Sequence, residues 1–369
     1  MSGCSFPMSH RGVRSAAAFL TILAMVACHP GPKSTSTAMR GSIQVEGAGS
    51  SFVYPLMNRW ISDFQADHQN VQINYQSIGS GGGIEQLKNG LIDFAASDAA
   101  LDDQQLKTMP AVVQIPESAG PVCLTYNLPQ LKAPLRLSSE TLVAIYLGRI
   151  KNWQDGAIKK DNPGVALPKA NIVTAHRSDG SGMTNIFSTY LAEVSPEWRK
   201  QVGRAISLSW PVGLGGKGNQ GVSGIVEETP GAIGYIELAY ATQNHLPVAR
   251  IRNKAGNWIE PSAASTTAAI EAFSNELAKD VRTPIVDPPA SAKEAYPIAG
   301  LTFVIIPKEA KNPAKARVVQ DFVQYIIAQG QNVSEKLSYA KLPMALREGN
   351  EALLAQLKGQ NNQAALIQK

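Results

Sequence analysis

The sequence predicts an α/β protein of two lobes. From residue 43 onward, short apolar runs typical of β-strands alternate with amphipathic segments typical of helices, which is the pattern of α/β folds. Without residues 1–27, which we interpret as an export signal, 342 residues remain, too many for one simple core and suited to two lobes. Two β-branched apolar runs, at residues 122–126 and 301–306, are strand candidates far apart in the sequence.

The N-terminus has the composition of a secretory signal. Two arginines precede a mostly apolar run at residues 15–27, which is shorter than the roughly 20 residues that span a bilayer. The run ends in LAMVAC and resembles the lipobox of bacterial lipoproteins, although Met25 stands where leucine is commonest. We therefore predict that residues 1–27 are a signal peptide and that Cys28 is lipidated. An ordinary cleavable signal with an incidental cysteine is the alternative.

Residues 28–42 are predicted to be a lipid-anchored tether, because they are rich in Pro, Gly, Ser and Thr and have no apolar period. The net charge of +5 falls to about +3 without the signal, and no Lys/Arg run with interleaved aromatic residues predicts a nucleic-acid partner. Cys123 lies in an apolar run and is predicted to be a buried thiol. No further segment reaches membrane length, so contact with a membrane is expected only through the lipid.

Individual elements follow from apolar periodicity. Phe52, Leu56, Trp60 and Phe64 recur every four residues and predict one face of a helix. Six glycines between residues 211 and 224 predict a long flexible loop. The other predicted elements are strands at residues 43–46, 71–75 and 91–97 and a short helix at residues 84–89.

Three Gly/Ser-rich turns, at residues 47–52, 79–83 and 177–182, each precede a helical pattern. A helix start leaves N–H groups unpaired and carries about half a positive charge, glycine allows close approach of a ligand, and serine adds a hydroxyl. Three such turns, one of which contains Arg177, favour a shared anion site. Each turn taken singly is also explained as an ordinary capped helix, and the pattern does not show whether the turns converge.

Asp98 follows the apolar residues 94–97, where an acceptor at the carboxyl end of a strand often faces a ligand crevice. The alternative is that Asp98 caps a helix beginning near Leu101. Motifs for other chemistry are missing from the sequence: residues 215–218 lack the Ser/Thr of a phosphate loop, no serine lies in a G-x-S-x-G elbow, and the histidines lack metal-ligand spacing. His176 is the one tempting base, with Ser181 five residues on. We expect no catalytic residue, no metal and no cofactor.

Seven segments, in this order and spacing, resemble motifs of the periplasmic phosphate-binding proteins of bacterial phosphate ABC importers. The likeness covers nearly all of residues 43–342. The segments are residues 47–52 (GAGSSF), 78–83 (IGSGGG), 93–98 (DFAASD), 146–150 (YLGRI), 177–182 (RSDGSG), 210–219 (WPVGLGGKGN) and 230–235 (PGAIGY).

This resemblance implies a type II periplasmic binding protein fold, in which two α/β lobes are joined by two crossing strands and hold phosphate between them. The crossings are expected near residues 122–127 and 299–306. Lobe one would then consist of residues 43–126 and 299–369, and lobe two of residues 127–298.

The resemblance also implies roles for individual residues. Asp98 would accept a hydrogen bond from the phosphate, Arg177 would supply the positive charge, and Asp179 would pair with Arg177 and hold it in place. The family pattern has threonine after Gly182, whereas this chain has Met183, so either one donor is lost or Thr184 replaces it. The phosphate-binding residues expected from the family are Ser51, Phe52, Ser80, Asp98, Arg177, Ser181, Gly182 and Met183.

The function implied by the resemblance is capture of inorganic phosphate in the periplasm for an import permease, without catalysis. The partners would be the permease and ATPase subunits of a phosphate ABC importer. Two alternatives remain: a binding protein for another oxyanion, such as sulfate, molybdate or a phosphonate, and a secreted phosphatase. Asp98 argues against anions that carry no proton, and the sequence offers no nucleophile with a base for the phosphatase. The sequence does not indicate which membrane would hold the anchor.

Overall fold

The computed structural model of the chain describes residues 42–367. The predictions for the signal peptide, Cys28 and the tether concern residues outside this range. None of the helices in the described part has the length and apolar character that crossing a bilayer requires.

An eight-stranded mixed sheet forms the centre of the molecule, in the order β2-β1-β3-β11-β4-β8-β6-β7. Strands β1, β2 and β3 are parallel to one another, as are β8, β6 and β7, whereas β11 and β4 run antiparallel to their neighbours. The strands are β1 (Ile43–Gly49), β2 (Val71–Ser77), β3 (Phe94–Ser97), β4 (Val112–Tyr126), β6 (Val173–Arg177), β7 (Leu214–Gly216), β8 (Ala232–Glu237) and β11 (Ala299–Pro307). A second, small sheet joins β5 (Arg136–Leu137), β9 (Arg250–Arg252) and β10 (Trp258–Ile259).

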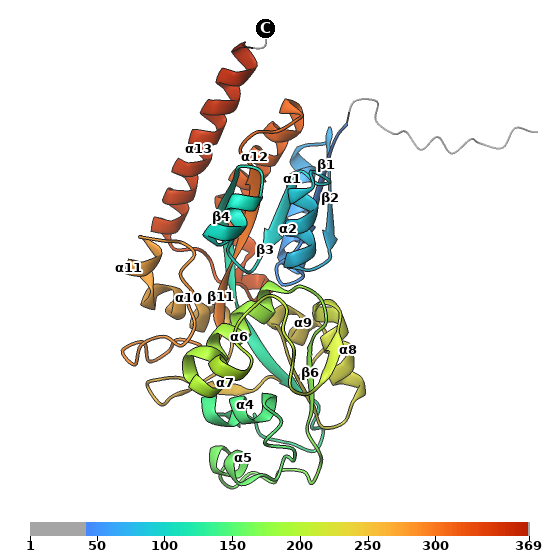
Figure 1. The fold of residues 1–369 in the computed structure, drawn as a ribbon, viewed down its shortest axis with the longest axis vertical. Helices are drawn as coiled ribbons and strands as arrows, with labels where there is room; N and C mark the ends of the chain where they lie inside the picture. Colours follow the sequence, from blue (N-terminus) through green and yellow to red (C-terminus); the bar gives the residue numbers. More distant parts are fainter. Residues whose placement is uncertain (1–41, 368–369) are drawn as a thin grey trace, which may run out of the picture. The chain divides into compact units, whose positions relative to one another are not determined.

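Strand β4 connects the two parallel parts of the sheet. Its residues from Val112 to Pro121 pair with β11, and its residues from Val122 to Tyr126 pair with β8. In Figure 1, β1 to β3 with α1, α2 and α12 lie at one end of the body, α4 to α9 lie at the other, and β4 and β11 run between them. The sequence identified only the last five residues of β4, because two prolines and three polar residues interrupt its apolar pattern before residue 122.

Helices cover the sheet and bury the large aromatic side chains. The Trp60 indole on α1 donates to the Gly330 carbonyl at 2.8 Å, and Phe64 packs edge-on against Phe322 of α12. The helices are α1 (Tyr54–Asp67), α2 (Ser80–Lys88), α3 (Asp103–Thr108), α4 (Ser139–Tyr146), α5 (Gly156–Asp161), α6 (Gly182–Val194), α7 (Pro196–Gln201), α8 (Gly218–Glu228), α9 (Leu238–Gln243), α10 (Ala263–Ala272), α11 (Ser274–Leu277), α12 (Pro313–Ile327) and α13 (Met344–Ile367), with 3₁₀ turns η1 (Gln329–Val333) and η2 (Glu335–Leu337).

The prediction of a flexible loop at residues 211–224 is wrong. This stretch contains β7 and most of α8, and Val222 is fully buried. Its glycines serve close packing: a Cβ on Gly216 would lie 2.5 Å from the Gly221 carbonyl carbon. The predicted α/β class is confirmed, and so is the buried position of Cys123, whose thiol donates to the Ile236 carbonyl.

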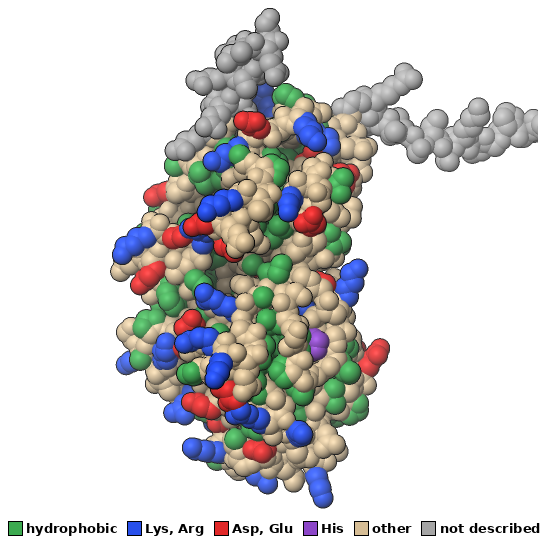
Figure 2. All heavy atoms as spheres, viewed as in Figure 1, with side chains coloured by type: hydrophobic (Ala, Val, Ile, Leu, Met, Phe, Trp, Pro, Cys, Tyr) green, Lys and Arg blue, Asp and Glu red, His purple; other side chains and the backbone are tan. Residues whose placement is uncertain are grey.

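Charged side chains of both signs are interspersed over the face drawn in Figure 2, where no large region of one sign is visible. This distribution agrees with the small net charge.

Candidate anion site

The three predicted turns lie at the starts of helices, where the strands β1, β2 and β6 end. α1 begins at Tyr54, two residues later than its apolar period suggested, so Phe52 precedes the helix. α2 begins at Ser80 and α6 at Gly182. The carboxyl ends of parallel strands in an α/β sheet form the edge where ligands commonly bind.

In the first turn, Ser50 has the central position. Its hydroxyl accepts the N–H groups of Phe52 (2.9 Å) and Val53 (3.3 Å) and forms a short hydrogen bond to the Asp98 carboxyl. Gly49 has a φ of +137°, and a Cβ there would lie 2.1 Å from the Ala96 carbonyl oxygen, so only glycine fits between β1 and β3. The neighbouring Ser51 side chain accepts hydrogen bonds from Asn219 of α8, at 3.0 Å from Nδ2.

Asp98 is buried and is surrounded by hydroxyl groups. Ser50 donates to its Oδ1 and Ser80 to its Oδ2 at 3.3 Å. Burial raises the pKa of Asp98 to about 6, because the carboxylate loses water, while the hydrogen bond of Ser50, the charge of Arg177 and the hydroxyls of Thr302 and Ser80 lower it. The alternative that Asp98 caps a helix is wrong: α3 begins at Asp103, and Asp102 is its cap.

Arg177, at the end of β6, is equally enclosed but has a charged partner. Its Nε and Nη2 donate to the two carboxylate oxygens of Asp179 at 2.7 and 2.5 Å. Burial alone would raise the pKa of Asp179, but the hydrogen bond and charge of Arg177 outweigh burial and hold that pKa below its ordinary value. The Gly218 N–H also donates to Asp179 Oδ1 at 3.1 Å, which ties the start of α8 to this pair.

The turns at residues 79–83 and 177–182 touch each other, although the sequence could not show it. The Gly81 N–H donates to the Gly180 carbonyl at 3.0 Å. A Cβ on Gly182 would lie 2.7 Å from the backbone nitrogens of Asp98 and Ala99 and from Ser80 Oγ. Since Ser51 is bonded to Asn219, the first turn also meets this cluster. The structure therefore brings all of the predicted binding residues to one buried region.

At the start of α6, Ser181 caps the helix by accepting the Thr184 N–H at 3.2 Å. Met183 is fully buried, and the Thr184 hydroxyl lies 2.6 Å from the Tyr235 hydroxyl, which accepts the Arg177 N–H. Thr184 thus supports the backbone of Arg177 through Tyr235. This contact favours the loss of one hydroxyl donor at the position of Met183.

Four residues of this region were not predicted individually: Ser50, Glu117, Asn219 and Thr302. Ser50 lies in the first turn, where its hydroxyl could have been weighed as a cap. Asn219 lay in the supposed flexible loop, yet its side chain bonds Ser51 and accepts the Glu237 N–H at 2.9 Å. Glu117 and Thr302 lie on strands, and no local pattern marks them.

His176 and Ser181, the candidate base and the serine five residues after it, each have other contacts. His176 stacks on Trp210, with ring centroids 5.0 Å apart, and its Nδ1 lies 3.1 Å from the Arg177 carbonyl. Ser181 is occupied as a helix cap. Within residues 42–367, no group of three or more His, Cys, Asp or Glu side chains is placed to hold a metal ion.

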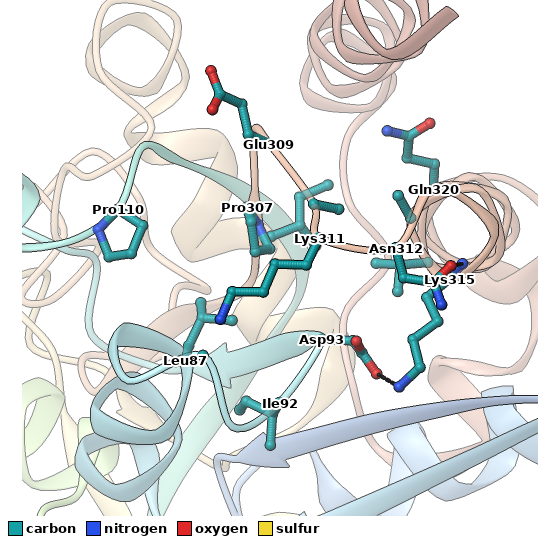
Figure 3. Close-up of a pocket in the computed structure, with 15 residues that line it drawn as sticks. Leu87, Ile92, Asp93, Pro110, Pro307, Glu309, Lys311, Asn312, Lys315 and Gln320 are labelled. Atoms are coloured by element: carbon teal, nitrogen blue, oxygen red, sulfur yellow. Dashed lines mark hydrogen bonds and ion pairs between the residues drawn. The ribbon is translucent and has the colours of Figure 1, made fainter. Parts of the chain in front are cut away.

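A pocket of about 300 Å³ lies elsewhere, between the end of β11, the start of α12 and the loop before β3. Figure 3 shows Lys315 reaching Asp93 across it, an ion pair of 2.9 Å, and Lys311 extending toward Leu87. Asp93 also accepts the Glu46 N–H, so it joins β1 to α12. None of the predicted phosphate-binding residues lines this pocket.

The architecture and the helix starts at strand ends define a periplasmic-binding-protein fold of type II. A family model described as a PBP superfamily domain matches residues 33–329. The chain belongs to this superfamily and, within it, to the family of PstS phosphate-binding proteins.

Two curated relatives support this membership. The phosphate-binding protein PstS of Xylella fastidiosa (strain Temecula1) is 43% identical over 315 residues, covering 85% of each chain. PstS of Pasteurella multocida is 40% identical over 300 residues, covering 81% of this chain and 86% of its own. A solved high-affinity periplasmic phosphate-binding protein, PfluDING with bound phosphate, shares the fold with a TM-score of 0.68 at 21% identity, covering 84% of this chain and 93% of its own.

Proposed function

We propose that this chain binds inorganic phosphate between the turns at residues 47–52, 79–83 and 177–182. The observation that carries the proposal is the buried meeting of one guanidinium, Arg177, and one carboxyl acceptor, Asp98, among serine hydroxyls and helix starts. The names of the PstS relatives agree with it.

The site would hold a dianion or monoanion mostly with neutral donors. Ser51 and the first N–H groups of α6 would donate, and Ser80 would donate by turning its proton from Asp98 to the anion. Asp179 would offset much of the Arg177 charge. Hydrogen bonds strengthen where water is excluded, so an enclosed set of neutral donors can stabilise an anion without a matching number of cations.

Selectivity would come from Asp98. Phosphate near neutral pH carries at least one P–OH proton, which it can donate to the ionised carboxyl. Sulfate carries none, so its oxygens would face the lone pairs of Asp98. A site that leaves a buried polar group wrongly paired can discriminate by about 10⁴- to 10⁵-fold.

Binding would involve closure of two lobes, residues 43–126 with 299–369 and residues 127–298. The pairing of β4 first with β11 and then with β8 supports a crossing near residue 122. The contact between Gly81 and Gly180 would then join the two lobes in the closed form.

In the cell, the chain would act in the periplasm, anchored by a lipid on Cys28, and would deliver phosphate to the permease and ATPase subunits of an ABC importer. The motif before Cys28 and the family support this arrangement. Labelling with a fatty acid in a bacterial host, lost in Cys28→Ser, would test the anchor. If the unsubstituted chain is never labelled, the anchor is refuted.

The relatives are substrate-binding proteins, and we extend that role to this chain without a catalytic step. The test is titration of purified protein with phosphate, arsenate and sulfate, followed by Trp210 fluorescence, with a chromogenic phosphate ester as a parallel assay. The ring centroids of Trp210 and Tyr235 are 5.6 Å apart, and the Tyr235 hydroxyl accepts the Arg177 N–H. The fluorescence of Trp210 should therefore report on the site. Saturable binding of phosphate without turnover of the ester supports the proposal; turnover, or preference for sulfate, contradicts it.

A further inference from the structure

Glu117 is fully buried at an irregularity of β4. In the pairing with β11, Ser118 is opposite Thr302 and Pro116 is opposite Phe303, so Glu117 has no partner across the strands. A bulge of this kind turns a side chain away from the direction that strand alternation would give it. The fold therefore places a carboxyl group inside the protein at the cost of regular pairing.

The contacts of this carboxyl are few. Its Oε1 lies 3.0 Å from Thr302 Oγ1, and its buried Oε2 has no hydrogen-bond partner. The Glu117 carbonyl is held by the Gln331 amide at 2.9 Å. An ionised carboxylate with one unpaired oxygen is costly inside a protein, whereas a neutral carboxylic acid costs much less.

Thr302 lies between two carboxyl groups. Its hydroxyl contacts Glu117, and because Phe303 pairs with Ser97 across β11 and β3, Thr302 lies beside Asp98, whose pKa its hydroxyl helps to lower. A hydroxyl has a single proton, so it cannot donate to two ionised carboxylates at once. If Glu117 holds a proton, it can donate to the Thr302 oxygen, and the Thr302 proton is then free for Asp98.

We propose that Glu117 is a neutral positioning residue for Asp98: its carboxylic acid donates to the Thr302 hydroxyl, which in turn donates to the Asp98 carboxylate. This arrangement keeps Asp98 ionised, acceptor-only and fixed in direction. It rests on the proposed function, because an acceptor of fixed direction is what recognition of a P–OH proton requires.

The electrostatic surroundings agree with the proposal. The pKa of Glu117 is raised to about 8, mainly by burial and also by the charge of Asp98, while the Thr302 hydrogen bond lowers it. Glu117 therefore holds its proton under conditions where Asp98 is largely ionised. Within residues 42–367, the cation that interacts with Asp98 is Arg177, which is already paired with Asp179. The other titratable side chains that interact with Asp98 or Glu117 are Glu237 at the start of α9, Tyr75 on β2, Tyr240 on α9 and Tyr339 after η2.

The binding test uses the pH at which sulfate begins to compete with phosphate. As the pH falls through the pKa of Asp98, the protonated carboxyl can donate to sulfate, so sulfate competition should appear. Thr302→Val removes a donor to the ionised Asp98 and should move this midpoint upward by about one pH unit. Thr302→Ser, which restores the hydroxyl, should return the midpoint to that of the unsubstituted protein. A midpoint unmoved in Thr302→Val overturns the relay.

The protonation state of Glu117 has its own test, which needs no ligand. The infrared difference spectrum of the full chain minus Glu117→Gln at pH 7 should contain the carbonyl band of a protonated carboxyl, since Glu237, whose pKa burial also raises, contributes equally to both proteins. In the sulfate assay, Glu117→Gln should leave the midpoint in place, because the amide is neutral and can donate to Thr302. A missing band, or a midpoint shifted to lower pH as expected from removal of a negative charge, overturns the proposal. If phosphate does not bind at all, the proposed function fails while the infrared result still decides the state of Glu117.

Discussion

Arg177 and Asp98 are two buried charged residues in the same region, and they are stabilised in different ways. Arg177 is paired with Asp179 through two short hydrogen bonds, so its charge is compensated by another charge. Asp98 is stabilised mainly by the neutral hydroxyls of Ser50, Ser80 and Thr302, and burial raises its pKa to about 6. Arginine stays protonated at any pH in use, whereas this carboxyl responds to its neighbours.

The difference assigns separate tasks to the two residues. A permanently charged, bidentately held guanidinium suits general attraction of anions. A carboxyl that depends on hydroxyl donors suits discrimination between anions with and without a proton. We therefore expect substitutions at Asp98 to change selectivity and those at Arg177 to change affinity for every anion.

The largest effect is expected for Asp98→Asn. The amide can donate where the carboxylate could only accept, so sulfate binding should rise while phosphate binding falls modestly. The phosphate-to-sulfate ratio should drop by more than about a hundredfold. Competition titrations of both anions at fixed pH and salt measure it. An unchanged ratio would remove Asp98 from the site.

Arg177→Ala should weaken phosphate and sulfate alike. A hydrogen bond from a charged donor contributes about 1.5–3 kcal/mol, which corresponds to roughly 10- to 150-fold in affinity, against about 0.5–1.5 kcal/mol for a neutral hydroxyl. Ser51→Ala is the matched neutral change, and calorimetric titration measures both variants. Equal losses in the two variants would contradict the role given to Arg177.

Gly182→Ala tests whether the turn at residues 177–182 must contact the turn at residues 79–83 and Asp98. Its Cβ would lie 2.7 Å from the backbone nitrogens of Asp98 and Ala99, so the turns would have to separate and phosphate affinity should fall by about tenfold, the scale of one lost hydrogen bond. Gly224→Ala on α8 is the control, because a Cβ there meets nothing within 4 Å. Binding data and a melting curve for both variants separate loss of closure from loss of folding. Full affinity in Gly182→Ala would show that the contact is dispensable.

Sequence patterns predicted the local parts of this region but not their assembly. The helix start at Gly182 followed from a Gly/Ser turn before an apolar period, because capping is decided within a few residues. The helix predicted at residues 84–89 begins four residues earlier, at Ser80 inside its glycine-rich turn. Convergence of turns about one hundred residues apart depends on strand order, which no local period encodes. The glycines near Asn219 were interpreted as flexible, although close backbone packing explains them equally well.

Glu117 shows most clearly what local sequence patterns could not predict. Its neighbours along β4 include two prolines and Ser118, so the segment lacks a strand period, and the bulge becomes visible only when β11 is paired with it. The family likeness supplied the residues expected to touch the anion. It said nothing about a carboxyl that acts on Asp98 through Thr302.

The last expected effect concerns stability rather than binding, and it separates Glu117 from the charged pair of Arg177 and Asp179. The folded state holds the Glu117 proton up to a pKa of about 8, whereas an ordinary glutamate releases it near 4.5. Between these values the folded protein binds more protons than the unfolded chain, so the free energy of unfolding should fall as pH rises, by about 1.4 kcal/mol per pH unit from this group alone. Glu117→Gln should remove that slope. Asp98 also makes the unfolding free energy depend on pH, but it does so in both proteins, so its contribution cancels in their difference.

Urea unfolding of the ligand-free proteins at pH 6, 7 and 8 measures the slope, with the exposed Glu271→Gln as the control substitution. If the unfolding free energies of Glu117→Gln and the unsubstituted protein stay parallel across this range, Glu117 is ionised in the folded state. It then has no proton to donate to Thr302, and its role as a neutral positioning residue for Asp98 is overturned.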